Sequence, residues 1–126
     1  MNLITSAGSD GCSASLRVRR PLCGISRAQR VAIACERVAE LAAIREKVGD
    51  DFWLMWDCWM SLEREYAVRL AGAANAYGLK WLEEPLIPDD YWGYRDLRRQ
   101  LPTGMLLTTG EHESTRYGFR MLLEMG

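Results

Sequence analysis

The chain has 126 residues, 48% of them hydrophobic, and a formal net charge of −1 at pH 7. That length supports one small domain or part of one, and the near-neutral charge argues against a nucleic-acid partner. No apolar run approaches the roughly 18 residues needed to span a bilayer, so we expect no membrane partner and predict a cytoplasmic location.

The four cysteines are widely spaced and form no C-x-x-C pair. They are Cys12, Cys23, Cys35 and Cys58. Neither a zinc knuckle nor a thioredoxin-like site is indicated, and reduced thiols are the expected state.

Residues 1–25 are rich in Ser, Gly and Arg and show no sustained period of 2 or 3.6. We therefore expect a disordered or irregular leader. Its basic cluster of Arg17, Arg19 and Arg20 is too small to favour a nucleic-acid or membrane contact over a solvated tail.

A helix of roughly 20 residues is predicted from Ser26 to near Gly49. Ser26 and Gln29 fit a capping box, and apolar residues then recur at helical spacing. These residues are Val31, Ala34, Cys35, Val38, Leu41 and Ala42. After the helix, the unbroken apolar run at 53–56 predicts a buried strand that Asp57 ends.

A second helix is predicted with Ser61 as its cap and Gly78 as its stop. One apolar stripe runs along it, formed by Leu62, Tyr66, Leu70, Ala73, Ala74 and Tyr77. Residues 80–82 then predict a short strand, after which Asp89 or Asp90 can cap a helix that runs to about Leu101.

A third strand is predicted over residues 105–109, and Glu113 or Ser114 can start a last helix. The order is a helix followed by three strand–helix units, which implies a parallel sheet with right-handed crossovers. Alternation alone does not separate a doubly wound sheet from part of a (β/α) barrel.

Three carboxylates, Asp57, Glu83 and Glu111, each follow one of the apolar runs. Their separations are 83 − 57 = 26 and 111 − 83 = 28 residues, about one strand, one helix and two loops. Side chains at the carboxyl ends of neighbouring parallel strands converge at one rim, and three hard oxygen donors there suit Mg²⁺. This favours an α/β fold that is a partial (β/α) TIM barrel, with about three consecutive strand–helix units preceded by a helix.

The same residues have structural interpretations. Asp57 could cap the turn after its strand, Glu84 could pair with a lysine, and Glu113 is better explained as a helix cap than as a ligand. Core and rim packing is a better account of the tryptophans than a stacking platform, although Trp59 could border the site. The tryptophans are Trp53, Trp56, Trp59, Trp81 and Trp92.

Three stretches in order carry a resemblance to a known family: WDCWMSL at 56–62, KWLEEP at 80–85 and TGEHE at 109–113. Together they resemble the enolase superfamily and, within it, the mandelate-racemase-like acid-sugar dehydratases. The likeness runs from about Val38 to Gly126. The segment PDDYWGY at 88–94 is similar to the rhamnonate-type members.

The resemblance implies that Asp57, Glu83 and Glu111 bind one Mg²⁺, which holds the carboxylate of an L-rhamnonate-like acid sugar. The implied reaction is that of a hydro-lyase: the proton next to the carboxylate is removed and the 3-hydroxyl departs, which gives a 2-keto-3-deoxy acid. By the same resemblance, His112 would contact the substrate, and Trp59 is a second candidate contact because of its position at a strand end.

Members of this family also have a capping domain and later strands that supply a His–Asp dyad as acid and base. Neither is expected here, so no catalytic acid or base is assigned. Residues 26–126 are expected to be a barrel fragment behind the leader, inactive alone. Two alternatives stay open: an inert or assembly-dependent fragment that self-associates, and a small stand-alone cation-binding α/β domain.

Overall fold

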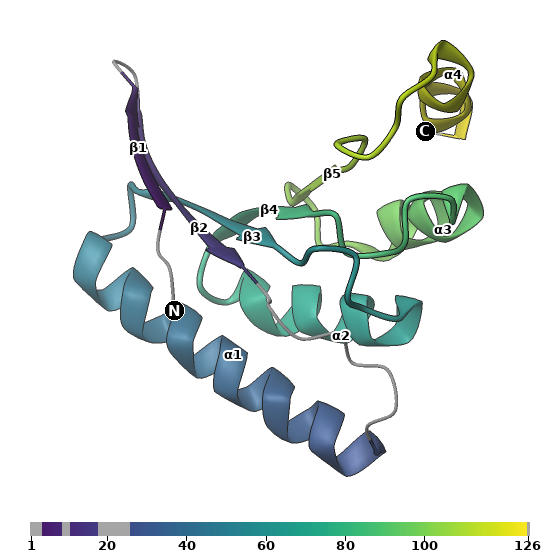
Figure 1. Ribbon diagram of the computed structural model, residues 1–126. Coiled ribbons are helices and arrows are strands. Elements are labelled where there is room, and N and C mark those ends of the chain that lie inside the picture. Colours follow the sequence, from purple (N-terminus) through teal and green to yellow (C-terminus); the bar gives the residue numbers. More distant parts are fainter. Residues whose placement is uncertain (1–3, 9–10, 18–25, 126) are drawn as a thin grey trace.

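The computed structural model describes residues 4–8, 11–17 and 26–125, shown in Figure 1. Strands and helices alternate after an initial pair of strands. In chain order the elements are β1 (Ile4–Gly8), β2 (Gly11–Arg17), α1 (Arg27–Val48), β3 (Trp53–Asp57), α2 (Arg64–Asn75), β4 (Leu79–Glu83), α3 (Tyr91–Gln100), β5 (Leu106–Thr108) and α4 (Arg116–Met125).

The strands form one sheet in the order β1-β2-β3-β4-β5. β1 and β2 are antiparallel, whereas β2, β3, β4 and β5 pair in parallel with their sequence neighbours. The predicted α/β fold with a parallel sheet is therefore confirmed. The parallel strands lie in the sheet in the same order as in the sequence. In a doubly wound sheet, by contrast, the strand order reverses at a switch point.

Two strands lie where an irregular leader was expected, so that expectation is wrong for Ile4–Gly8 and Gly11–Arg17. β2 pairs with β3, with Ala14 opposite Leu54 and Leu16 opposite Trp56. A strand stabilised by a partner about 40 residues away leaves little local signal, because strand formation depends strongly on tertiary context. The rest of the expected leader, including Arg19 and Arg20, lies outside the described residues.

The helices cover the sheet so that each one contacts the next along the chain, α1 with α2, α2 with α3, and α3 with α4. Figure 1 shows α1 and α2 running along the same face of the sheet. The buried core joins α1 and α2 to β3 and β4 through apolar side chains that include Leu41, Leu54, Trp56, Leu70, Ala74 and Leu82. The core thus fixes the strands whose carboxyl ends carry the candidate site.

The helix starts follow local capping chemistry with one exception. The capping box of Ser26 and Gln29 is confirmed, and Asp90 caps α3 by accepting a hydrogen bond from the Gly93 amide. Ser61 is not the cap predicted for α2, since its hydroxyl donates to the Cys58 carbonyl and the helix begins at Arg64.

Core packing is confirmed for Trp56 alone among the three tryptophans in β3 and the loop after it, since Trp53 and Trp59 are more than half exposed. Trp56 is buried in the core, while Trp53 and Trp92 are about half exposed under the cationic groups of Lys80 and Arg95. Among the described residues, no helix has the length and apolar character needed to cross a membrane.

Candidate metal centre

Asp57 and Glu83 end two neighbouring parallel strands at the same level. They are partners in the register of β3 and β4, and Glu83 is in turn opposite Thr108 of β5. Glu111 lies three residues beyond Thr108, the last residue of β5 (111 − 108 = 3). The third carboxylate is therefore on a loop and not at the end of its strand. We call Asp57, Glu83 and Glu111 the rim carboxylates.

The Asp57 side chain is oriented by the turn that follows β3. It is 6% exposed, and its Oδ1 accepts a hydrogen bond from the Trp59 amide at 3.0 Å. The structural interpretation of Asp57 as a turn cap is thus confirmed. A carboxylate held by a backbone donor is also preorganised for a ligand role, because the donor restrains its rotamer.

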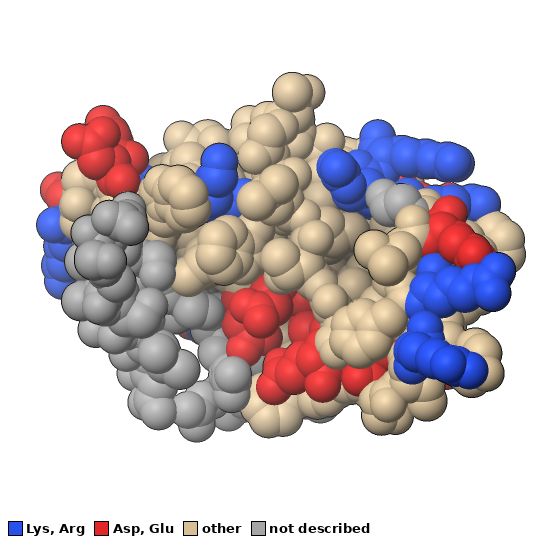
Figure 2. All heavy atoms as spheres, turned by 90° about the horizontal axis from the view of Figure 1, so that it is seen from above, with Lys and Arg blue, Asp and Glu red and all other residues tan. Residues whose placement is uncertain are grey.

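The Glu83 carboxylate lies in a strongly acidic environment. Burial, then the charge of Asp57, and then the charges of Glu111 and Glu84 raise the pKa of Glu83 above its usual value, against a smaller opposing contribution from Trp81. Figure 2 shows acidic side chains gathered near the middle of one face, with Lys and Arg side chains mostly towards its margins. A divalent cation would relieve this repulsion, so the donor set fits a hard ion such as Mg²⁺.

Glu111 is exposed and does not complete a ligand cluster in this conformation. Within the described stretches, no three His, Cys, Asp or Glu side chains lie close enough together to hold a metal ion. The structure therefore brings Asp57 and Glu83 together and leaves Glu111 nearby on the adjacent loop.

Backbone strain concentrates at this rim. Trp59, Met60 and Glu84 have positive φ angles of 44°, 54° and 44°; the first two lie in the loop after β3, and Glu84 directly follows β4. Non-glycine residues in this conformation each cost on the order of 1–3 kcal/mol and cluster at functional sites. The loops after β3 and β4 are thus held in a conformation that propensity alone would not select.

Glu84 is the residue whose role sequence reasoning missed. Its side chain is 2% exposed, and Oε1 accepts hydrogen bonds from Thr109 Oγ1 at 2.9 Å, Gly110 N at 2.7 Å and Glu111 N at 3.3 Å. The suggested pairing with a lysine is wrong, because these donors belong to the loop after β5. Glutamate is usually exposed and its donors here are 25–27 residues away, so no local pattern indicated this role.

The interpretation of Glu113 as the cap of α4 is wrong, because α4 begins at Arg116 and Thr115 caps it, its hydroxyl accepting from the Gly118 amide at 3.1 Å. Glu113 holds the turn before the helix. Its Oε1 accepts from the amides of Ser114 and Thr115, and its Oε2 accepts from the Tyr91 hydroxyl at 2.7 Å. The Tyr91 hydroxyl, followed by the amides at the helix start, lowers the pKa of Glu113. Glu113 thus ties α3 to α4 and is not available as a fourth rim ligand.

Three other polar groups lie near the rim. His112 and Trp59, the candidate substrate contacts, are both exposed. Burial, followed by the charges of Asp57 and Glu83, raises the pKa of the Cys58 thiol. Cys58 therefore stays protonated and is a poor candidate for a thiolate ligand or nucleophile.

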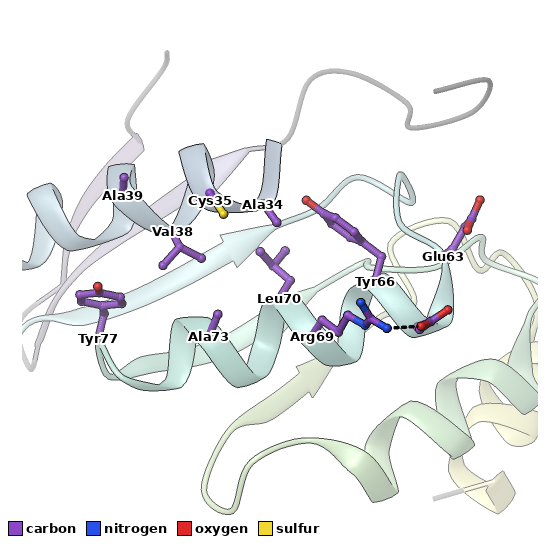
Figure 3. A pocket seen from close by; sticks show the side chains of 11 residues that line it. Ala34, Cys35, Val38, Ala39, Glu63, Tyr66, Arg69, Leu70, Ala73 and Tyr77 are labelled. Carbon is purple, nitrogen blue, oxygen red and sulfur yellow. Dashed lines mark hydrogen bonds and ion pairs between the residues drawn. The ribbon is translucent and has the colours of Figure 1, made fainter. Parts of the chain in front are cut away.

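A separate hollow of about 680 Å³ lies between α1 and α2 (Figure 3). Its lining is mainly apolar, with Val38, Leu70 and Tyr77 facing the space and the Arg69–Glu65 ion pair at one side. None of the rim carboxylates lines it. Of the carboxylates that line the hollow, Glu65 is paired with Arg69, whereas Asp57 and Glu83 end adjacent strands at one level, so the rim is the candidate metal site.

Comparison with known proteins gives consistent matches. Residues 26–126 match the protein family described as "Enolase C-terminal domain-like". The chain is 70% identical over 89 residues to an L-rhamnonate dehydratase of Saccharopolyspora erythraea, a stretch that covers 71% of this chain and 23% of that protein.

Solved structures agree with this likeness. The crystal structure of L-rhamnonate dehydratase from Gibberella zeae is 45% identical with a TM-score of 0.69, over 72% of this chain and 23% of that one. A racemase from Streptomyces coelicolor A3(2) with bound magnesium is 32% identical with a TM-score of 0.73, over 88% of this chain and 29% of that one. The chain thus spans 23–29% of the length of these relatives.

Proposed function

The chain belongs to the enolase C-terminal domain-like family, and from that premise we propose that it is the metal-binding part of a Mg²⁺-dependent acid-sugar dehydratase. The observation that carries the proposal is the pairing of Asp57 with Glu83 at the carboxyl ends of adjacent parallel strands, with Glu111 on the loop after the next strand. The 70% identity to an L-rhamnonate dehydratase supports L-rhamnonate as the substrate and 2-keto-3-deoxy-L-rhamnonate as the product.

Within this proposal, Asp57, Glu83 and Glu111 hold Mg²⁺. When bound, the ion would offset the negative charge that develops on the substrate carboxylate as the neighbouring proton leaves. The Trp59 amide orients Asp57, and the strained loops after β3 and β4 keep the acidic side chains at one rim. His112 and Trp59, both exposed there, are the proposed substrate contacts.

The acid and base of the reaction are not assigned to these residues. His112 is the sole histidine of the sequence, and it follows Glu111 directly. A general acid and a general base each typically contribute about 10²–10⁴-fold. We therefore propose that the chain alone does not turn over L-rhamnonate at a measurable rate.

The proposed parent architecture is a (β/α) barrel of which this sheet forms one segment. The sequence-ordered parallel strands and the helices that pack each against the next support it. Assembly with further barrel strands, or with other copies of the chain, is a second proposed function. Its support is the exposed apolar surface of β5 and α4, which includes Leu106, Tyr117, Phe119 and Leu123, the last 82% exposed.

A chimera tests the proposed function. The 89-residue matching stretch of this chain replaces its counterpart in the Saccharopolyspora erythraea protein, and the product is assayed for Mg²⁺-dependent conversion of L-rhamnonate to the 2-keto-3-deoxy acid. The expected results are turnover by the chimera, loss of turnover in its Glu83→Ala variant, and none by the chain alone. A chimera that folds and binds Mg²⁺ but leaves L-rhamnonate unchanged would contradict the assigned substrate.

A further inference from the structure

We propose that Glu84 is the positioning residue of the metal centre, which fixes the loop after β5 and thereby sets where Glu111 stands. Three donors of that loop converge on one oxygen of Glu84: the Thr109 hydroxyl, the Gly110 amide and the Glu111 amide. This inference rests on the proposed function, since it assigns a role to Glu84 in the same site.

The backbone of Glu84 is locked at the junction of three strand ends. Its amide donates to the Thr108 carbonyl of β5 at 2.9 Å, and its carbonyl accepts from the Met60 amide in the loop after β3. Its φ of +44° is a conformation that a glutamate adopts only under constraint from its surroundings. Because the backbone of Glu84 is fixed, its side chain has a defined position, and the loop that donates to this side chain is restrained as well.

The arrangement explains how Glu111 can be a ligand although it lies beyond the strand. β5 ends at Thr108, and the chain then turns through Gly110, whose φ is +115°. Without a partner, the amides of Gly110 and Glu111 would face solvent and the loop would be free to move. Charge-assisted hydrogen bonds from two backbone amides to one carboxylate are stronger than neutral ones, so Glu84 holds this turn in place.

The second oxygen of Glu84 indicates that the carboxylate is not there for stability alone. Oε2 is buried and has no hydrogen-bond partner among the residues that the structure describes. A buried carboxylate with one unsatisfied oxygen is costly. An apolar residue would fill the space at lower cost, but it could not accept the three loop donors.

The test compares Glu84→Ala with Glu84→Gln. The glutamine keeps a carbonyl oxygen that can accept from the loop amides, whereas alanine removes the acceptor. Two quantities are measured in the intact chain: hydrogen exchange of the Gly110 and Glu111 amides, and affinity for Mn²⁺ by calorimetry. Glu111→Gln serves as a ligand control, which should weaken Mn²⁺ binding without changing exchange at Gly110.

For Glu84→Ala we expect faster exchange at Gly110 and Glu111, unchanged exchange in α2, and a loss of Mn²⁺ affinity of about 10–100-fold, as for other residues that orient metal ligands. For Glu84→Gln the loss should be smaller than for Glu84→Ala, because the acceptor remains. Wild-type exchange at both amides in Glu84→Ala would overturn the inference. The inference would also be overturned if Glu84→Ala and Glu84→Gln lost the same Mn²⁺ affinity while the Gly110 and Glu111 amides stayed protected from exchange.

If Glu84→Ala does not fold, a less disruptive pair of variants tests the same hydrogen bonds. Thr109→Val removes the hydroxyl that donates to Glu84, whereas Thr109→Ser keeps it. The inference is supported if the Gly110 and Glu111 amides exchange faster in Thr109→Val but not in Thr109→Ser. Identical exchange in these two variants contradicts it. If the wild-type chain binds no Mn²⁺, the proposed function fails, while the exchange experiment still decides whether Glu84 positions the loop.

Discussion

Asp57 and Glu83 lie opposite each other in the register of β3 and β4, so two adjacent parallel strands end in carboxylates at one level. Burial and the charge of Asp57 are the two largest causes that raise the pKa of Glu83. The metal-free chain therefore bears an electrostatic cost at the place where a divalent ion would bind.

Replacing Glu83 by glutamine is expected to raise the melting temperature of the metal-free chain at neutral pH, because it removes a partly buried like charge. The pKa of Glu83 is raised in the folded state, so the folded chain binds the proton more tightly than the unfolded chain. Wild-type stability is therefore lost as pH rises from the ordinary glutamate pKa through the folded value, and is regained on acidification.

Thermal melts across this pH range check the prediction. Glu46→Gln, an exposed change on α1, is the matched control and should alter stability by less than about 0.5 kcal/mol. A Glu83→Gln variant that melts below the wild type at neutral pH would show that Glu83 is stabilised by its surroundings.

Tyr94→Phe should destabilise the fold by about 1–3 kcal/mol. The Tyr94 hydroxyl donates to the Leu86 carbonyl at 2.6 Å and accepts from the Leu86 amide at 3.3 Å, and both residues are buried. Phenylalanine would leave both backbone groups without this partner. Urea denaturation measures the effect, with the exposed Tyr117→Phe as the control that should change little.

Alanine at two helical glycines should have opposite effects. Gly72 of α2 has open space where a Cβ would be, so Gly72→Ala should stabilise the chain by about 0.5–1 kcal/mol. At Gly93 of α3 a Cβ would come within 2.0 Å of Asp90 Oδ2 and 2.6 Å of Arg64 Nε. Gly93→Ala should therefore lower the melting temperature, and equal gains at the two positions would contradict this geometry.

Asp90→Asn separates the capping role of this residue from its charge. An asparagine can still accept from the Gly93 amide, but the ion pair with Arg64 is lost. The side-chain hydrogen bond from Arg64 is the largest cause that lowers the pKa of Asp90, so the charge contributes stability above the ordinary aspartate pKa and loses it as pH falls through the folded value. In thermal melts at decreasing pH, the Asp90→Asn variant should not show the loss of stability that protonation of Asp90 causes in the wild type. The Asp90→Ala variant should in addition lose about 1 kcal/mol of capping at all pH values.

Local chemistry was sufficient to predict much of the fold. The capping box at Ser26, the cap at Asp90 and the apolar runs before Asp57 and Glu83 depend on residues close in sequence, and the structure has each of them. Asp57 and Glu83 are opposite each other because β3 and β4 pair in parallel, and the alternation of strands and helices in the sequence predicted parallel pairing.

Long-range contacts account for the features that were missed. β2 exists through its pairing with β3, and the donors to Glu84 are 25–27 residues away in the sequence. Ser61 had the composition of a cap, but its hydroxyl is used by the Cys58 carbonyl in the strained loop after β3. No window of local sequence contains these partners, so periodicity and propensity could not reveal them.

Calorimetric titration of Mg²⁺ and Mn²⁺ into the chain, and into the double variant of Asp57→Ala and Glu83→Ala, tests the central claim most directly. We expect weak binding by the wild type, because Glu111 lies on an exposed loop and the ligands are not yet gathered at the Mg²⁺ distances of about 2.0–2.1 Å. The double variant should show no binding, with its helical content checked by circular dichroism. Tight binding that survives both substitutions would contradict the assignment of the metal centre to this rim.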